Sequence, residues 1–316
     1  MGEDEWTVDP PPGVDGRTVV VTGANSGIGF EATRAFAAGG ARVVMACRSV
    51  ERGEEAAAEA READPPGELV VRELDLASLS SVRSFASGVD EPVGVLVNNA
   101  GVMAVPYGET EDGFETQYGV NHLGHFALTG LLLDRLRAVE GESRVVTVSS
   151  DMHKQGRPNP VVREGIDPDS YGRWTAFARS KLANLLFAFE LQRRFEAAGE
   201  DVKSVGVHPG YADTDLQRRA PEMLGSRVWL YFMKVANLVM AQSAERGSWP
   251  ILYGATHPDL SGGEYVGPTG IMEMRGSPGV VEPSKRARNE DLAGRLWDAS
   301  EELTGVTYDL VAAPAG

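Results

Sequence analysis

The sequence predicts an α/β protein with one Rossmann-type, doubly wound parallel sheet of about seven strands and helices on both faces. Three observations lead to this fold class. Short apolar runs alternate with longer helical segments along most of the chain, a glycine-rich turn follows the first run, and polar or small residues follow the later ones. Repeated strand-helix alternation is typical of a parallel sheet covered on both sides, and right-handed crossovers leave few topologies.

Each expected strand is a short run rich in valine and other apolar residues. The expected strands span residues 18–21, 42–46, 69–73, 93–97, 144–149, 203–208 and about 264–266. The expected helices span about residues 28–38, 50–63, 78–87, 114–137, 175–198 and 289–303. No linker, repeat or low-complexity break divides the chain, so we expect a loose acidic, proline-rich arm at residues 1–14 and one domain over 15–310.

Composition narrows the classes of function. The chain has 316 residues, 42% of them hydrophobic, with no apolar run long enough for a transmembrane helix. The N-terminus does not resemble a signal peptide, and the single cysteine, Cys47, suits the cytoplasm. A net charge of -16 disfavours binding to nucleic acid or anionic membranes. The acidic, lysine-poor composition also hints at a halophile or a GC-rich genome.

A glycine-rich turn follows the first expected strand and opens the first expected helix. It reads T-G-A-N-S-G-I-G over Thr22–Gly29. Gly23 suits a turn conformation that a side chain disfavours, and Gly27 and Gly29 allow close approach of a ligand and of the neighbouring strand. The free N–H groups at the helix start favour an anion such as a pyrophosphate. The residues that we expect at a cofactor here are Gly23, Asn25, Ser26, Gly27, Ile28 and Gly29.

Polar and small residues also follow the other expected strands, where a parallel sheet binds its ligand. These strand ends carry Arg48, Asp75, residues 98–101, residues 149–150 and residues 209–210. The chain thus has the features of a binding face along one edge of the sheet.

The chain resembles a short-chain dehydrogenase/reductase, because these motifs follow one another in the order that is typical of that family. The matching stretches are Thr22–Gly29, Asp75, Asn98–Gly101, Asn121 within 120–124, Ser149–Ser150, Lys181 within 180–184, and Pro209–Gly210 with Thr214. Residues 46–48, 122–126 and 180–187 resemble the retinol-dehydrogenase-like branch of that family. The resemblance covers nearly the whole chain and implies hydride transfer between a nicotinamide cofactor and an alcohol or carbonyl compound.

The resemblance implies NADP(H) as cofactor, with NAD less favoured. Family members that prefer NAD have an acidic side chain at the end of the second strand, where this chain has Cys47 followed by Arg48. A guanidinium can bind a 2′-phosphate through several donors, although Arg48 could also be a solvated loop residue. By the same resemblance, the remaining cofactor-binding residues are Asp75, Leu76, Asn99, Ala100, Gly101, Lys181, Pro209, Gly210 and Thr214.

The resemblance also assigns a catalytic group, with one departure. Ser150, Lys181 and Asn121 match the family's substrate-binding serine, lysine and water-anchoring asparagine, but the position of the general-acid tyrosine holds Phe177. A phenyl ring cannot pass a proton. Phe177 could be an engineered change, could mark an NADP-binding protein without turnover, or could be compensated by another group. The candidates for that group are Tyr171, His153 and Tyr211.

The remaining expectations concern the substrate and the other histidines. Residues 211–261, with an apolar stretch at 229–240, predict a lid over an apolar alcohol, aldehyde or ketone. A core or dimer helix is an equal alternative, so a homo-oligomer is possible, and a membrane-surface helix is weaker. We expect His153 to be a solvated loop residue and His122 and His125 to support packing, with no metal site.

Overall fold

The computed structural model describes residues 10–155, 159, 161, 168–210 and 243–310. Its central element is an eight-stranded sheet in the order β3-β2-β1-β4-β5-β6-β7-β8. The strands are β1 (Thr18–Thr22), β2 (Arg42–Cys47), β3 (Glu68–Glu73), β4 (Val95–Asn98), β5 (Ser143–Val148), β6 (Val202–Val207), β7 (Tyr265–Pro268) and β8 (Pro278–Val280). The first seven are parallel, so the predicted doubly wound α/β fold is confirmed.

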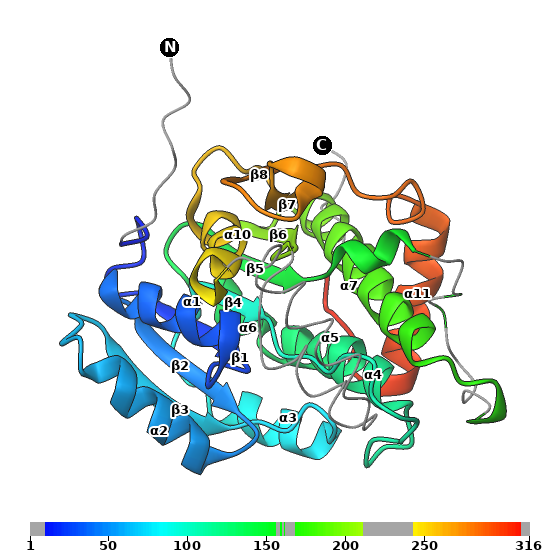
Figure 1. Ribbon diagram of the computed structural model, residues 1–316, viewed down its shortest axis with the longest axis horizontal. Helices are drawn as coiled ribbons and strands as arrows, with labels where there is room; N and C mark the ends of the chain where they lie inside the picture. Colours follow the sequence, from blue (N-terminus) through cyan, green and yellow to red (C-terminus); the bar gives the residue numbers. More distant parts are fainter. Residues whose placement is uncertain (1–9, 156–158, 160, 162–167, 211–242, 311–316) are drawn as a thin grey trace, which may run out of the picture.

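The helices lie around this sheet (Figure 1). The longer ones are α1 (Gly27–Ala38), α2 (Val50–Arg61), α3 (Leu79–Ser87), α5 (Gly124–Leu131), α7 (Arg173–Ala198), α10 (Ala244–Thr256) and α11 (Glu290–Thr304). The shorter ones are α4 (Thr116–Tyr118), η1 (Gly119–Leu123), α6 (Leu133–Arg137), η2 (Asp151–Lys154), η3 (Pro168–Ser170) and η4 (Ile271–Glu273). In Figure 1, α1 lies beside α10, and α11 lies beside α7.

The sheet buries both of its faces because successive strand residues point to opposite sides. In β1, Val19 and Val21 belong to the core beneath α1, α2 and α10, whereas Val20 belongs to the core beneath α3, α5, α7 and α11. All three valines are fully buried. No helix in the described part of the chain is long and apolar enough to cross a membrane.

The eighth strand was not predicted. β8 is only Pro278-Gly279-Val280, a combination that signals a turn, and it pairs antiparallel with β7 at the sheet edge. Proline is tolerated there because an edge strand does not need every N–H group. The sheet therefore has eight strands rather than the seven that the apolar runs indicate.

One helical prediction needed correction, and one helix was not predicted. The expected helix over residues 114–137 is divided into α4, the π-helical turn η1, α5 and α6. Gly124 ends the wide turn and approaches the Leu76 carbonyl so closely that a Cβ would lie 2.7 Å from it. The helix α10 was missed because Pro250 lies inside it, and proline normally interrupts a helix.

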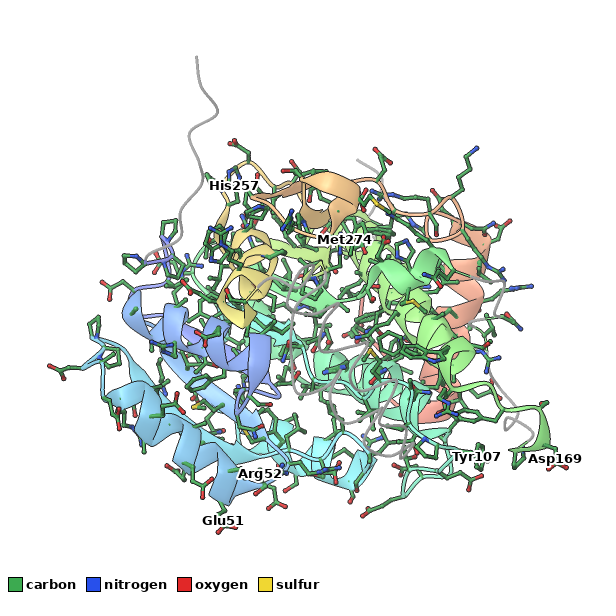
Figure 2. The ribbon with its side chains drawn as sticks, in the orientation of Figure 1. Glu51, Arg52, Tyr107, Asp169, His257 and Met274 are labelled. Carbon is green, nitrogen blue, oxygen red and sulfur yellow. The ribbon has the colours of Figure 1, made fainter. Side chains whose placement is uncertain are left out.

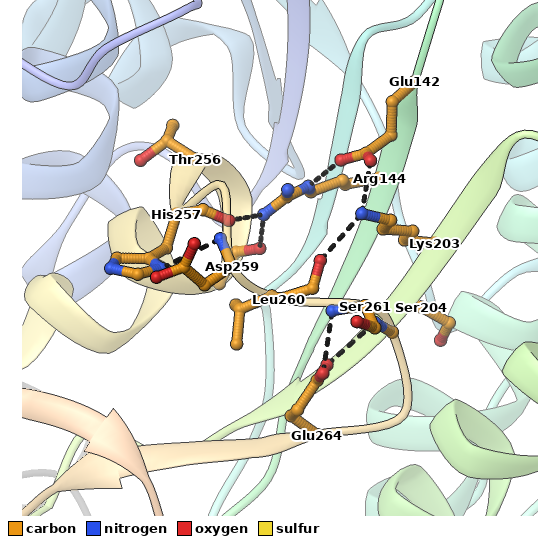
Figure 3. A network of polar contacts seen from close by, with 12 residues as sticks. Glu142, Arg144, Lys203, Ser204, Thr256, His257, Asp259, Leu260, Ser261 and Glu264 are labelled. Carbon is orange, nitrogen blue, oxygen red and sulfur yellow. Dashed lines mark hydrogen bonds and ion pairs between the residues drawn. The ribbon is translucent and has the colours of Figure 1, made fainter.

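A buried arginine fastens α10 to the edge of the sheet where β5 and β6 begin (Figure 3). Arg144 is paired with Glu142 and donates hydrogen bonds to the carbonyls of Gly254 at 3.1 Å and His257 at 2.9 Å. Lys203 also pairs with Glu142 and donates to the Leu260 carbonyl at 2.7 Å. The last carbonyls of α10 and the chain after it therefore have charged donors at the edge of the sheet opposite the strands' carboxyl ends.

Candidate active site

A cavity of about 360 Å³ lies at the carboxyl ends of the parallel strands. It is lined by residues 22–23, 25–28, 46, 48, 52, 74–77, 99–103, 116, 120, 148–150, 177, 181 and 209–210. These segments are far apart in the sequence, and the sheet brings them to one edge, where α/β proteins bind their ligands.

Most of the predicted cofactor residues line this cavity. Those that do are Gly23, Asn25, Ser26, Gly27, Ile28, Arg48, Asp75, Leu76, Asn99, Ala100, Gly101, Lys181, Pro209 and Gly210. Gly29 lies behind the lining, and Thr214 lies outside the described residues. Of the predicted catalytic residues, Ser150, Phe177 and Lys181 line the cavity, whereas Asn121 lies behind Gly101.

The glycine-rich turn requires glycine for two reasons. Gly23 and Gly27 have φ values of 67° and 56°, in the region that favours residues without a side chain. A Cβ on Gly29 would lie 2.4 Å from Nδ2 of Asn99 and 2.5 Å from the Gly23 carbonyl oxygen. Ser26 is the N-cap of α1, but its side chain makes no capping bond, so the first N–H groups of α1 are available to an anion in the cavity.

Thr22 joins the turn to the end of β4. Its hydroxyl accepts hydrogen bonds from the backbone N–H groups of Asn99 and Ala100, each at 2.9 Å. It also lies 2.9 Å from Nε2 of His125. Because Nδ1 of His125 donates to the Asn121 carbonyl at 3.0 Å, Nε2 is the acceptor for the Thr22 hydroxyl. Burial, together with nearby Lys181, lowers the pKa of His125 to about 4, which keeps this ring neutral.

The end of the cavity near β2 and β3 carries two arginines. Arg48 follows β2, and Arg52 lies in the first turn of α2, where Ser49 caps the helix by accepting from the Arg52 N–H at 3.3 Å. Figure 2 shows Glu51 pointing out from the lower edge of the molecule, with Arg52 above it. Asp75 accepts a hydrogen bond from the Ala77 N–H at 2.9 Å. Asp75 is the one carboxylate among the described residues that line the cavity.

At the other end of the cavity, Ser150 follows β5, and Lys181 lies on α7, which packs beside β5. The Ser149 hydroxyl donates to the Lys181 carbonyl at 2.8 Å, and Nζ of Lys181 donates to the Val148 carbonyl at 3.1 Å. Phe177 lies one turn earlier on α7, with its ring centroid 5.8 Å from Nζ. The side chains of Phe177 and Lys181 are 3% and 5% exposed, so both are held firmly in the wall of the cavity.

Asn121 has a structural function that the sequence did not reveal. Its Oδ1 accepts from the Val102 N–H at 2.8 Å, and its Nδ2 donates to the Val102 carbonyl and to the Ser180 hydroxyl, each at 2.9 Å. Both amide donors are therefore used. Asn121 fastens the loop after β4 to α7, and a relay water would have to use the remaining lone pair of Oδ1.

Two of the groups suggested as a replacement for the tyrosine do not reach the cavity. The Tyr171 hydroxyl accepts from Nε2 of Gln117 at 2.6 Å and lies near the Val105 carbonyl and Glu115. Burial, followed by the Glu115 charge, raises the pKa of Tyr171 to about 12. Neither Tyr171 nor His153 lines the cavity. The third candidate, Tyr211, lies outside the described residues.

His153 is buried, so the expectation of a solvated loop histidine was wrong. Its side chain is 3% exposed, Nδ1 donates to the Ser150 carbonyl at 2.8 Å, and Nε2 accepts from the Ser284 N–H at 3.0 Å. This arrangement requires a neutral ring, and burial lowers the pKa of His153. The ring fastens the segment after Ser150 to the loop that precedes α11.

His122 and His125 are also buried, and Nε2 of His122 bonds the Ser300 hydroxyl at 2.9 Å. Over the residues that the structure describes, no cluster of histidine, cysteine and acidic side chains could hold a metal ion.

Sequence reasoning missed several residues that line the cavity. Arg52 had an available signal, because it lies in the first helical turn after the Arg48 strand end. Met103 and Thr116 had none, because their positions depend on how the segment between β4 and α5 folds over the cavity.

The predicted lid over residues 211–261 is only partly described. Residues 211–242 lie outside the described part, including the apolar stretch at 229–240. The segment from Ala244 to Thr256 is α10, which buries Ile251 and Leu252 against the core beneath α1. This part of the predicted lid belongs to the layer that covers the sheet.

Known proteins are similar to this chain in sequence and fold. Residues 17–163 match the profile of the short chain dehydrogenase family. Retinol dehydrogenase 14 of Mus musculus is 41% identical over 306 residues, covering 92% of this chain and 86% of that protein. Polyprenol dehydrogenase of Mus musculus is 41% identical over 308 residues, with 94% and 87% covered.

Solved structures agree with this assignment. A crystal structure of an uncharacterized protein from Mycobacterium paratuberculosis has a TM-score of 0.78 and 44% identity, covering 97% of this chain and 100% of the other. A protein assigned as an NAD(P)-dependent gluconate 5-dehydrogenase from Beutenbergia cavernae, with NADP bound at low occupancy, has a TM-score of 0.62 and 27% identity over 81% of this chain and 96% of the other.

The chain therefore belongs to the short chain dehydrogenase family of oxidoreductases. Within that family it lies in the retinol-dehydrogenase-like branch.

Proposed function

We propose that the protein transfers hydride between NADP(H) and an apolar alcohol or carbonyl compound, slowly because Phe177 replaces the general-acid tyrosine. The observation that carries this proposal is the single cavity shared by the glycine-rich turn, Arg48, Ser150 and Lys181. One elongated ligand with an anionic middle could contact the turn in its centre, the arginines at one end and Ser150 at the other.

The residues of the cavity fit NADP(H), which when bound supplies or accepts the hydride. The N–H groups at the start of α1 favour the pyrophosphate. Arg48 and Arg52 would hold a 2′-phosphate, because Cys47 offers no carboxylate to repel it. Asp75 keeps acceptor capacity for the adenine amino group, and Lys181 would bond the nicotinamide ribose. The bound NADP in the Beutenbergia cavernae relative supports this choice.

The substrate end of the cavity favours an apolar compound. Val102, Met103, Val120 and Phe177 line it with carbon atoms. The relatives named for retinol and polyprenol act on alcohols with long hydrocarbon chains, which supports the same class of substrate here.

The chain's own residues define how the oxygen of the substrate is held. Ser150 Oγ accepts a weak hydrogen bond from the Met152 N–H at 3.3 Å, which leaves its proton free to donate to a carbonyl oxygen. Phe177, in the position from which the family's tyrosine acts, excludes water and packs against Lys181 but supplies no proton.

A second candidate function is the binding of NADP(H) without turnover, as a sensor or structural ligand. The buried phenyl ring of Phe177 favours it, because a positioned general acid contributes about 10²–10⁴ in rate and the ring removes that contribution.

The native chain and Phe177→Tyr together separate these functions. NADPH binding is measured by the fluorescence of the bound nucleotide, and turnover by the nicotinamide absorbance with nonanal and with other apolar aldehydes and ketones. We expect both forms to bind NADPH and the variant to turn over about 10²–10⁴ times faster. Failure to bind NADPH would exclude both functions. Binding by both forms with turnover by neither would favour the binding protein.

A further inference from the structure

We propose that Lys181 is itself the proton donor to the substrate oxygen in this chain, in place of the hydroxyl that Phe177 lacks. This inference rests on the proposed function, and it adds that the native chain retains a proton donor in the cavity. The contacts of the Lys181 ammonium group in this structure are the basis for this assignment.

The ammonium of Lys181 is only partly bonded. Within the described part of the chain, its one hydrogen bond goes to the Val148 carbonyl at 3.1 Å, although an ammonium carries three donors. The same carbonyl also accepts from Nδ2 of Asn184 at 3.1 Å. Nζ lies 3.6 Å from where a Cβ on Gly101 would be, so the absence of a side chain there keeps the ammonium open to the cavity. At least one N–H is thus available to a substrate oxygen or to a water beside it.

The other charged side chains that line the cavity lie at the end away from Lys181. Of the described residues that line it, Arg48, Arg52, Asp75 and Lys181 carry charges, and the first three belong to the end near β2 and β3. An arginine is also a poor acid because its guanidinium does not lose a proton in proteins. Lys181 is therefore the charged donor beside Ser150 and Phe177.

The surroundings favour release of the proton. Burial alone lowers the pKa of Lys181 to about 8, with no carboxylate acting to raise it. The ionisable group that faces it from α5 is His125, which burial keeps neutral and which donates and accepts bonds within the protein. Neither β5 nor the glycine-rich turn presents an acidic side chain to Nζ: their residues nearest the cavity are Val148, Ser149, Ser150 and Gly23. An ammonium with a pKa near the working pH is suited to general-acid catalysis.

The step balances without another reactant. In the direction of reduction, bound NADPH would supply the hydride for the new C–H bond at the carbonyl carbon. The carbonyl π electrons become an O–H bond with the proton that leaves Nζ, while Ser150 holds the oxygen. Lys181 is left as a neutral amine and regains its proton from water. In the reverse direction, the neutral amine accepts the alcohol proton.

A double-mutant cycle tests this assignment with nonanal and saturating NADPH. Lys181→Arg keeps a cation but removes a usable acidic proton. In the native Phe177 background we expect this change to reduce turnover by at least about 10²-fold. With Phe177→Tyr the tyrosine supplies the proton and Lys181 acts only as a cation, so the same change should cost about tenfold or less. Equal losses in the two backgrounds would overturn the proposal.

A measurement that does not depend on turnover follows the lysine itself. Trace acetylation of the NADPH-loaded chain, read by mass spectrometry across pH, reports the titration of each amine. We expect Lys181 to react with a midpoint near pH 8, where the native turnover rate also declines as pH rises, because the active acid is lost. Exposed Lys285 is the internal control for the reactivity of a solvent-accessible amine. A Lys181 midpoint equal to that of Lys285 would overturn the proposal.

Three further outcomes separate this proposal from the proposed function. If Phe177→Tyr turns over and the native chain does not, Lys181 is not the donor, although the proposed chemistry of the site stands. If Tyr211→Phe abolishes native turnover while Lys181→Arg does not, the donor is Tyr211. If no form turns over with any aldehyde or ketone, the proposed reaction fails and this inference fails with it.

Discussion

At the scale of single residues, we expect the preference between NADP(H) and NAD(H) to depend on charge at one end of the cavity. Arg48 and Arg52 line that end. Cys47, beside them, is fully buried, and burial raises the pKa of its thiol to about 11. Cys47 is therefore a neutral, buried side chain, and it does not bond the ribose hydroxyls as a carboxylate would at this position.

Arg48→Asp should reverse this preference. The change removes a phosphate donor and adds a charge that repels a 2′-phosphate, and each charge-assisted hydrogen bond is worth about 1.5–3 kcal/mol. We expect NADPH affinity to fall about tenfold or more and NADH affinity to rise. Fluorescence titration with both nucleotides measures it, with the neighbouring Glu51→Gln as a control that should leave the ratio unchanged. An unaltered ratio in Arg48→Asp would refute the role of Arg48.

Residues also show the limit of reasoning from spacing. Phe177 and Lys181 lie four residues apart on α7, one helical turn, and both line the cavity. The burial of His153 and the hydrogen bonds of Asn121 could not be predicted, because their partners are Ser284, Val102 and Ser180. Those partners lie up to 131 positions away in the chain.

At the scale of elements, the junction between β1 and α1 determines the shape of the nucleotide end. The turn packs against the end of β4, where Nδ2 of Asn99 donates to the Thr22 carbonyl at 2.8 Å. The lack of a side chain at Gly29 lets the start of α1 lie directly against the side-chain amide of Asn99. The helix and the two strands therefore form one rigid corner.

Gly29→Ala should disturb that corner. The added Cβ would meet Asn99 and the Gly23 carbonyl, and overpacking of this kind costs about 1–3 kcal/mol of unfolding free energy. We expect NADPH affinity to fall as well, since the N–H groups of α1 would shift. Urea unfolding and fluorescence titration measure the two effects. The matched control is Gly294→Ala in α11, where nothing lies within 4 Å of the new Cβ and a small gain of about 0.4–1 kcal/mol is expected. Similar results for the two variants would contradict this account.

At the scale of the whole molecule, the two ends of the strands have different functions. The cavity lies at their carboxyl ends, and the Arg144 network lies where β5 and β6 begin (Figure 3). A strand of six residues separates these ends by about 20 Å. Stability and binding should therefore be separable by mutation.

Arg144→Met should destabilise the fold without altering the cavity. The change leaves the Gly254 and His257 carbonyls without their charged donor, at a cost of about 1–3 kcal/mol. NADPH affinity should remain unchanged. Urea unfolding with a parallel titration tests both statements. Arg34→Met, which removes an exposed ion pair with Glu31, should change stability by no more than about 0.5 kcal/mol. A large loss of affinity in Arg144→Met would show that the two ends are coupled.

The buried histidines should make stability depend on pH. Burial lowers the pKa of His122 to about 3, of His125 and His208 to about 4, and of His153 below its usual value. Each is neutral in the folded protein but takes up a proton near pH 6.5 when unfolded. Their stabilising contribution is therefore complete above about pH 6.5 and is lost as pH falls toward the folded pKa values.

We expect the free energy of unfolding, measured with urea, to fall between about pH 6.5 and 5, by up to about 1.4 kcal/mol per pH unit for each histidine. The urea midpoint should fall with it. Paired carboxylates such as Glu142 add to the loss only at lower pH, near about 4.5 and below. Replacing buried His122 with asparagine should make the curve shallower. A midpoint that stays constant from pH 7 to 5 would contradict the prediction.

The sequence by itself determined the parallel α/β fold, the glycine-rich turn and the face on which most of the cavity residues lie. These follow from local rules, because strand alternation, glycine turns and helical spacing act over a few residues. Only the tertiary structure decided that Arg52, Met103 and Thr116 share the cavity, that β8 adds an edge strand, and that the Lys181 ammonium is open to the site. Those features depend on packing between segments distant in the chain, and burial and contact arise only when such segments meet.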